Sequence, residues 1–243
     1  MEKFWPRLPV LDLRLEAHKK LDSILEVVWP WADRALALLT ASIALVRIYG
    51  KTPELAVFFT GLAFPLFVLA IVFRSPPLAG PLPSISGLIG MVMSYPAVAF
   101  LEIPASVISP FIHGRCGQIV LGACVVYVLF AAWSFYAIGR SFAIFPSARK
   151  LVTRGPYAIV RHPIYSSFLH LALCVTVLAP SGRNAAATAV MGLGVLLRAR
   201  SEEMLLSRGE AYGGFRARVK SRFFNPVLSA PLVAAAVLCF AKL

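Results

Sequence analysis

Two short polar segments in the C-terminal half of the chain hold the residues whose types and spacing could do chemistry. Residues 151–165 contain two prolines, a glycine, two tyrosines, two arginines and a histidine, and they lie between two long apolar runs. Residues 198–203 contain two arginines and end in the adjacent carboxylates Glu202 and Glu203. Irregular, polar sequence beside apolar runs must be buried in protein or line a wet cavity. We therefore predict that the two segments form the two halves of one site.

The spacing within the second segment predicts which side chains face this site. Neighbours on a helix lie about 100° apart, so at most one of Glu202 and Glu203 should point into the site while the other faces the basic loops. Arg198 precedes Glu202 by four residues and shares its face of the helix. A plain ion pair on the surface of the helix is the alternative interpretation of this spacing.

Other polar residues nearby have structural interpretations. His170 is expected to be a hydrogen-bonded core histidine. His162-Pro163 could simply begin a helix, because proline suits a first helical turn. Four basic residues downstream are expected to meet lipid phosphates: Arg216, Arg218, Lys220 and Arg222.

The composition indicates an all-α, polytopic integral membrane protein. Apolar residues make up 59% of the 243 residues and charged residues 14%, whereas soluble domains have about 45–50% and about 25%. The net charge is +13, and the basic residues lie in short loops between apolar runs, which is typical of a surface that meets anionic headgroups. The absence of a separate basic domain argues against a nucleic-acid partner.

Apolar periodicity predicts about six transmembrane helices and four regions. Residues 1–33 form an amphipathic helix that lies in the membrane interface. Residues 34–138 contain four transmembrane helices, at about 34–49, 54–73, 85–103 and 118–138, and Gly122 and Ala123 suit a close helix contact in the last of them. Residues 139–226 contain a helical hairpin of two spans, at about 164–179 and 184–197. Residues 227–243 are apolar and could lie in the interface, re-enter the membrane or cross it as a seventh span.

The distribution of basic residues predicts the orientation. The loops that precede the first span, that precede the fifth span and that follow the sixth span hold most of the lysines and arginines. By the positive-inside rule, both ends of the six-span core are then cytoplasmic, and the two polar segments share the cytoplasmic face.

The cysteines offer no chemistry by their spacing. The four of them are Cys116, Cys124, Cys174 and Cys239, which mostly fall in apolar runs. We predict that they are small core side chains and form neither disulfides nor a metal site.

Two motifs connect these segments to a known family. Residues 161–165 read Arg-His-Pro-Ile-Tyr, and residues 202–206 read Glu-Glu-Met-Leu-Leu. With Arg222-Phe-Phe-Asn-Pro226 they resemble the isoprenylcysteine carboxyl methyltransferase family, which is related to the membrane phospholipid methyltransferases and has an RHPxY motif followed by EExxL. The resemblance extends over about residues 139–226, and the two motifs stand in the family order, separated by one helical hairpin.

The resemblance implies S-adenosylmethionine as the cofactor at the cytoplasmic membrane surface, and a lipophilic or lipidated substrate that arrives from the bilayer. Arg198 falls where the family holds the substrate carboxylate. The positions that would bind the cofactor are Arg149, Lys150, Leu151, Val152, Tyr157, His162, Pro163, Ile164, Tyr165 and Glu202. The chain departs from the family at Ser167, where many members have glycine, and at Arg149-Lys150, where the eukaryotic enzymes have histidine and threonine.

Several functions remain open at this point. Carboxyl O-methylation of an isoprenoid-type lipid is the first prediction, and N-methylation of a phospholipid amine or S-methylation of a small thiol are alternatives within the class. A membrane reductase that uses NADPH, and a transporter or scaffold without enzymatic activity, are alternatives from other classes. Membrane lipids are the expected partners, with no metal and no nucleic acid.

Overall fold

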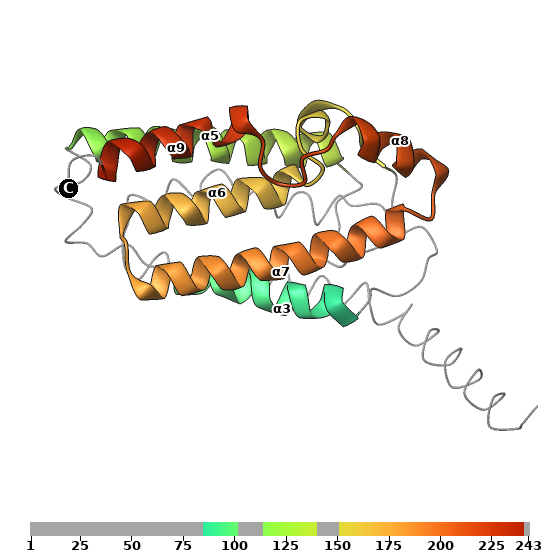
Figure 1. The fold of residues 1–243 in the computed structure, drawn as a ribbon, viewed down its shortest axis with the longest axis horizontal. Helices are drawn as coiled ribbons and strands as arrows, with labels where there is room; N and C mark the ends of the chain where they lie inside the picture. Colours follow the sequence, from blue (N-terminus) through green and yellow to red (C-terminus); the bar gives the residue numbers. More distant parts are fainter. Residues whose placement is uncertain (1–84, 102–113, 140–150, 241–243) are drawn as a thin grey trace, which may run out of the picture.

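A computed structural model describes residues 85–101, 114–139 and 151–240 (Figure 1). The predicted interfacial helix, the first two predicted spans, Arg149 and Lys150 lie outside these residues. The described residues are helical and contain no strand, which agrees with the all-α prediction. Six α-helices and one 3-10 turn make up this part: α3 (Ile85–Phe100), α5 (Arg115–Ile138), η2 (Gly155–Ala158), α6 (Pro163–Leu178), α7 (Gly182–Leu206), α8 (Glu210–Arg218) and α9 (Pro226–Phe240).

Five of the helices form a bundle, in which α5 runs antiparallel to α6 and α9, and α7 runs antiparallel to α6 and α3. Figure 1 shows α5 beside α9, α6 in the middle, and α7 beside α3. The predicted helical hairpin is α6 and α7. Its turn is held by Ser181, whose Oγ accepts a hydrogen bond from the Asn184 backbone N at 3.1 Å, and by Asn184, whose Nδ2 donates to the Ala179 carbonyl at 2.8 Å. Helix α7 runs past the predicted end of the sixth span to Leu206, so the Glu-Glu-Met-Leu-Leu motif lies on the hairpin helix itself.

Two glycines allow α3 and α7 to touch backbone to backbone. A Cβ atom added to Gly90 would lie 2.5 Å from the Gly194 carbonyl oxygen, and one added to Gly194 would lie 2.7 Å from the Gly90 carbonyl oxygen. Such distances leave no room for a side chain at either position. A close contact was also predicted at Gly122 and Ala123 of α5. Ala123 is buried in the core, but the prediction was wrong for Gly122, which is exposed and has no described atom within 4 Å of its added Cβ.

The C-terminal helix α9 packs on α5 around a proline. Pro231 lies inside α9 and can neither donate a backbone hydrogen bond nor fit the regular helical ladder. The buried Tyr127 of α5 bridges this region, because its hydroxyl donates to the Leu228 carbonyl at 3.0 Å and accepts from the Leu232 backbone N at 3.1 Å. The apolar segment at residues 227–243 is therefore a helix docked against α5 and α6 over its described length.

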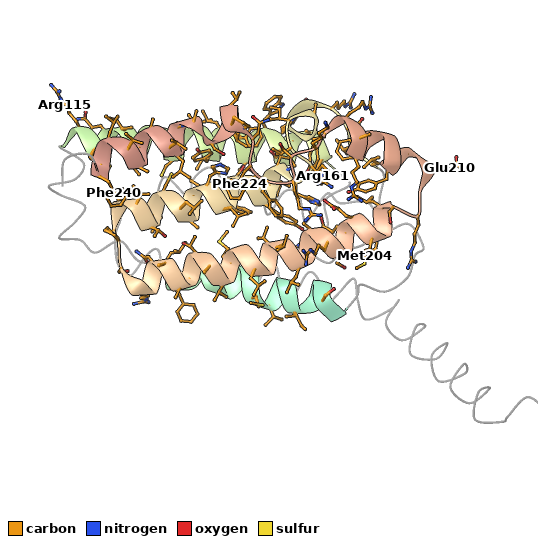
Figure 2. The ribbon with its side chains drawn as sticks, in the orientation of Figure 1. Arg115, Arg161, Met204, Glu210, Phe224 and Phe240 are labelled. Atoms are coloured by element: carbon orange, nitrogen blue, oxygen red, sulfur yellow. A yellow bond between two sulfur atoms is a disulfide. The ribbon has the colours of Figure 1, made fainter. Side chains whose placement is uncertain are left out.

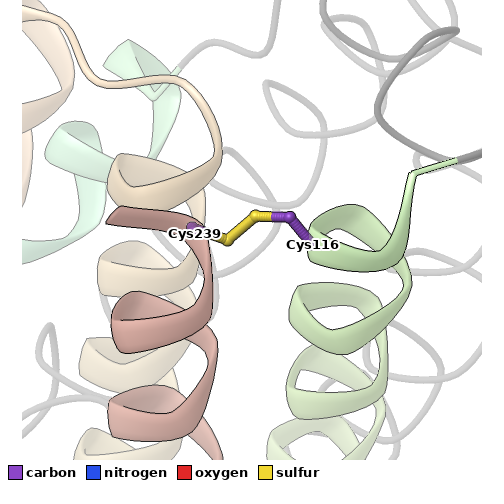
Figure 3. Close-up of a disulfide and its surroundings, with 2 residues drawn as sticks. All are labelled: Cys116 and Cys239. Carbon is purple, nitrogen blue, oxygen red and sulfur yellow. A yellow bond between two sulfur atoms is a disulfide. The ribbon is translucent and has the colours of Figure 1, made fainter. Parts of the chain in front are cut away.

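A disulfide joins Cys116, near the start of α5, to Cys239, near the end of α9 (Figure 3). The prediction that the cysteines form no disulfide was therefore wrong for this pair. The pairing could not be found from the sequence, because 123 residues separate the two cysteines and only the antiparallel packing of α5 and α9 brings them together. Cys124 and Cys174 remain free and buried, as predicted for small core side chains.

The described helices differ in whether they are long and apolar enough to cross a membrane. Helix α5 is long and apolar enough to do so, whereas α6 and α9 are apolar but shorter. In the part of the chain that the structure describes, α5 is the one helix that meets both criteria.

Candidate functional site

The two polar segments predicted to meet do meet, at one end of the bundle. Figure 2 shows Arg161 and Met204 near this end and Arg115 and Phe240 at the opposite end. The approach to α6 turns at Gly155, which has φ +64°. This left-handed conformation favours glycine, and it brings η2 against Trp133 of α5, whose Nε1 is 3.5 Å from the position of an added Gly155 Cβ.

His162 lies between the two carboxylates of α7. Its Nδ1 is 3.4 Å from Glu202 Oε2, and its Nε2 is 3.1 Å from Glu203 Oε1. Both of the adjacent carboxylates therefore contact His162, one at each ring nitrogen. The imidazole presents a nitrogen on each of two edges, so neighbouring carboxylates that leave the helix in different directions can each reach one nitrogen.

Glu203 forms the more enclosed half of this cluster. Arg222 donates two hydrogen bonds to Glu203, from Nε to Oε1 at 3.0 Å and from Nη2 to Oε2 at 2.7 Å. Arg161 forms a further ion pair, with Nη1 2.9 Å from Glu203 Oε1. The prediction that Arg222 meets only lipid phosphates was wrong, because its guanidinium is turned inward to this carboxylate. The prediction that one glutamate faces the basic loops is correct for Glu203.

The segment at residues 220–223 lies against the start of α6 through its backbone. Arg161 N donates to the Ser221 carbonyl at 3.0 Å, and His162 N donates to the Arg222 carbonyl at 3.1 Å. Ser166 Oγ donates to the Phe223 carbonyl. The chain that follows α8 is thereby fastened along the Arg-His-Pro-Ile-Tyr motif.

Tyr165 and Arg198 continue the site toward the middle of the bundle. The Tyr165 ring stacks on His162, with centroids 5.6 Å apart and planes 7° from parallel, and its hydroxyl donates to Glu202 Oε1. The Arg198 guanidinium lies over the Tyr165 ring, 4.9 Å from its centroid, and only 2% of Arg198 is exposed. Arg198, Tyr165, His162 and Glu202 are thus one contiguous cluster, and the alternative of a plain surface ion pair does not describe a buried arginine.

The charges in this cluster shift one another's titration. Burial would lower the pKa of His162, but its hydrogen bonds to Glu202 and Glu203 outweigh this and raise that pKa. Burial would raise the pKa of Glu203, but His162 and Arg222 lower it to about 2. The pKa of Glu202 is lowered in the same way by His162, with the nearby Arg198 adding to the effect. The two carboxylates and the histidine therefore stabilise one another's charged forms.

The other predicted cofactor positions lie around this cluster with less specific roles. Tyr157 in η2 is buried, and burial together with the charge of Glu202 raises its pKa well above the usual value. Pro163 and Ile164 are buried in the first turn of α6. Leu151 packs against the small apolar cluster of Tyr212, Phe215 and Val219 that docks α8, and Val152 is partly buried beside it in sequence.

His170 is a core residue, as predicted. It is fully buried, with Nδ1 2.8 Å from the Ser166 carbonyl oxygen and Nε2 2.9 Å from Ser229 Oγ. Because a carbonyl only accepts, Nδ1 carries the proton and Nε2 accepts from the serine hydroxyl. Both ring nitrogens of His170 are thus hydrogen-bonded, and neither of these partners is charged.

Sequence reasoning missed the part played by residues after α8. Arg222 binds Glu203, and Phe223 lies against His162 with ring centroids 5.9 Å apart. Their signal was present in the run Arg222–Pro226, which forms part of the family resemblance. Basic residues in a loop are ordinarily assigned to solvent or lipid, so the charge of Arg222 alone did not single it out.

The fold and the site together define a helical protein with a buried, ion-paired site at one end of its bundle. Residues 119–208 match the isoprenylcysteine carboxyl methyltransferase (ICMT) family. The matched residues include both motifs, so the resemblance predicted from them is confirmed for this part of the chain. Members of this family are methyltransferases. No curated protein matches the chain as a relative.

Proposed function

We propose that this protein is an S-adenosylmethionine-dependent methyltransferase of the membrane, and that it methylates a carboxylate on a lipid-like, isoprenoid-type acceptor. The observation that supports this most strongly is the contiguous cluster of His162, Tyr165, Glu202 and Arg198. The two matched motifs contribute His162, Tyr165 and Glu202, and Arg198 lies one turn before the second motif.

The chemistry of the cluster fits the proposed cofactor. S-adenosylmethionine supplies a methyl group activated by a sulfonium, and it also has an ammonium, a carboxylate, ribose hydroxyls and an adenine. Glu202 is the more accessible carboxylate, with 21% of its side chain exposed against 8% for Glu203, and it suits the ammonium or the hydroxyls. Tyr165, Tyr157 and His162 supply flat faces and hydrogen bonds. The remaining positions assigned to the cofactor are Arg149, Lys150, Leu151, Val152, Pro163 and Ile164.

Arg198 is the proposed holder of the acceptor. Its guanidinium fork suits a carboxylate, which it would hold in line with the reacting methyl group. A carboxylate arrives already ionised and needs no general base, so the protein's contribution is to position the acceptor and to exclude water. A lipid amine would be repelled by a cation here, which places N-methylation second and S-methylation of a thiol beside it.

The surface of the described helices supports a location within the membrane. Large apolar side chains are exposed on several helices of the bundle, among them Leu129 on α5, Leu193 on α7 and Val237 on α9. Such a surface is unusual for a soluble monomer and suits lipid contact. We propose the multi-pass arrangement predicted from the loop charges, with the charged end of the bundle facing the cytoplasm.

Binding of the cofactor to the purified protein in detergent tests this proposal. Labelled S-adenosylmethionine should bind and labelled NADPH should not, since NADPH binding would instead favour a membrane reductase. Glu202→Gln should weaken S-adenosylmethionine binding by roughly 10- to 150-fold, because a charge-assisted hydrogen bond contributes about 1.5–3 kcal/mol. Glu210→Gln on α8 is the matched control, since Glu210 is exposed, and it should bind as the unaltered protein does. Equal affinity in both variants would contradict the assignment of Glu202.

A further inference from the structure

We propose that Glu203 is a positioning residue, which fixes His162 directly and through Arg222, so that Tyr165 and Glu202 are held in place for the ligand. This inference rests on the proposed function. It assigns the two adjacent glutamates different tasks, with Glu202 directed to the cofactor and Glu203 directed to the protein.

The first argument is that the contacts of Glu203 occupy both of its carboxylate oxygens. Oε1 lies 2.9 Å from Arg161 Nη1, 3.1 Å from His162 Nε2 and 3.0 Å from Arg222 Nε, and Oε2 lies 2.7 Å from Arg222 Nη2. A carboxylate offers about four lone-pair sites in all. With 8% of its side chain exposed, Glu203 has little capacity left for a ligand, unlike the more exposed Glu202.

The second argument is that these contacts form a closed ring. The Glu203 carboxylate binds the Arg222 guanidinium, and the Arg222 carbonyl accepts a hydrogen bond from the His162 backbone N at 3.1 Å. The His162 imidazole in turn contacts Glu203, which closes the ring. The ring joins α7, the start of α6 and the segment at residues 220–223. A movement of any one of these three pieces must break a charge-assisted contact.

The third argument concerns what the ring orients. The His162 ring is stacked at 7° on Tyr165, and the Tyr165 hydroxyl donates to Glu202. The orientation of the imidazole, set at Nε2 by Glu203, is thereby passed to the side chains that would meet the cofactor. Outer contacts of this kind orient a site without touching its ligand, and in metal sites their loss costs about 10–100-fold in metal affinity or activity.

Glu203→Gln, Arg222→Gln and the double variant test the ring together, with Glu210→Gln as the control. Each single variant should raise the dissociation constant for S-adenosylmethionine by about 10–100-fold and raise the KM for the cofactor similarly. The kcat at saturating cofactor should change by less than about threefold, because Glu203 acts on binding geometry and not on the transferring methyl group. The double variant should be no worse than the poorer single variant, since both break the same ring.

Titration of His162, followed by NMR of the labelled imidazole, gives a readout that does not depend on the cofactor. The charged and titratable groups that face His162 or its partners are Glu202, Glu203 and Arg198 from α7, Arg161 and Tyr165 beside it, Tyr157 from η2, Tyr212 from α8 and Arg222 from the segment after α8. Removal of the Glu203 charge should lower the pKa of His162, and the Glu210→Gln control should leave it unchanged.

The outcomes separate this inference from the function on which it rests. If the unaltered protein binds no S-adenosylmethionine, the proposed function fails, and the His162 titration still decides whether Glu203 holds the imidazole. If the cofactor binds but Glu203→Gln changes neither its affinity nor the pKa of His162, the positioning role is overturned. Fully additive losses in the double variant would also overturn it. Should Glu203→Gln fail to fold, Glu203→Asp and Arg222→Lys replace it in the test. The first keeps the charge on a shorter side chain, and the second keeps the charge without the planar guanidinium. Both variants should bind S-adenosylmethionine more weakly.

Discussion

Two histidines of α6, His162 at its N-cap and His170 inside the helix, lie in opposite environments. Comparing them shows how the bundle separates ligand binding from core packing. His162 lies between two carboxylates, with an arginine pair behind one of them. His170, two helical turns further on, is bound by a backbone carbonyl and a serine hydroxyl, and its ring lies 4.5 Å from that of Tyr127. The residue type is the same, so the difference arises from what the neighbouring helices present.

The two environments predict different kinds of sensitivity. A charged cluster responds to pH and to the loss of a single charge, and it offers binding energy to a charged ligand. A neutral hydrogen-bonded core responds to the loss of a partner through stability alone. Substitutions in the first region should therefore change binding or turnover, and substitutions in the second should change unfolding.

The largest effect is expected where one helix serves both regions. Gly194→Ala would place a Cβ 2.7 Å from backbone atoms of α3, and the overpacking should cost about 3 kcal/mol or more of the free energy of unfolding. Because Glu202 follows two turns later on α7, cofactor affinity should fall as well. Thermal unfolding in detergent and calorimetric binding measure the two effects. Gly192→Ala is the control, since among the described residues its added Cβ meets only Leu169, at an ordinary 3.7 Å. A similar loss in both variants would contradict the role of the close contact.

The next effect isolates the charged region. Arg198→Ala should lower turnover by roughly 10- to 150-fold, as expected for the loss of charge-assisted hydrogen bonds to an acceptor carboxylate. Arg198→Lys keeps the charge without the planar fork and should give an intermediate loss. Turnover and cofactor affinity, both measured on one preparation of each variant, distinguish a role in holding the acceptor from a role in binding the cofactor. If Arg198→Ala weakens cofactor binding alone, Arg198 does not hold the acceptor, and amine or thiol methylation becomes the better proposal.

A smaller effect isolates the neutral region. Tyr127→Phe removes the hydroxyl that bridges Leu228 and Leu232 beside Pro231, which leaves two backbone groups of α9 without this partner. The free energy of unfolding should fall by about 1–3 kcal/mol, measured by thermal or denaturant unfolding in detergent. Cofactor affinity should stay within a factor of about two, and a larger change would show that the two regions are not separate.

The smallest effect is the dependence of stability on pH. Folding raises the pKa of His162, so its contribution is fully present below the unfolded value of about 6.5 and is lost as pH rises through the folded value. The slope from one proton is at most about 1.4 kcal/mol per pH unit. Folding lowers the pKa of Glu203 to about 2, so its contribution is lost in the opposite direction, as pH falls from about 4.5 toward 2.

His162→Gln should therefore flatten the stability profile above about pH 6.5, whereas His170→Gln should lower stability without changing the slope there. Unfolding measured at several pH values in one detergent checks both. A change of slope in the His170 variant, with none in the His162 variant, would reverse the assignment of the two histidines.

The sequence predicted α3, α5, α6 and α7 and the meeting of the two motifs, because hydropathy, helix breakers and motif order are local signals. The bounds of α5 and α6 lie within three residues of the predicted spans, and His170 was assigned correctly from its place inside an apolar run. The partners of Glu203 could not be predicted in the same way. Arg222 reaches it only because the chain turns back after α8, and such a turn leaves no periodic trace in the sequence.

Long-range contacts also explain the other errors. Gly122 and Gly194 look alike as glycines in apolar helices, and only the position of α3 decides which of them is pressed against a neighbour. Neither the partner of Cys116 nor the inward turn of Arg222 follows from spacing. These features depend on tertiary packing, which overrides local preference.

The bond between Cys116 and Cys239 closes a covalent ring that contains α5, η2, α6, α7, α8 and most of α9, and with them every described residue of the site. Of the described helices, α3 alone lies outside this ring, attached by its packing against α7. A protease that cuts the chain once at the exposed Ser207-Arg208-Gly209 turn would open the ring without releasing either half of the site. The piece after the cut, which holds Arg222 and α9, would then stay bonded to the piece that holds both motifs until a reductant separates them. A nicked protein should therefore migrate as two pieces only on a reducing gel.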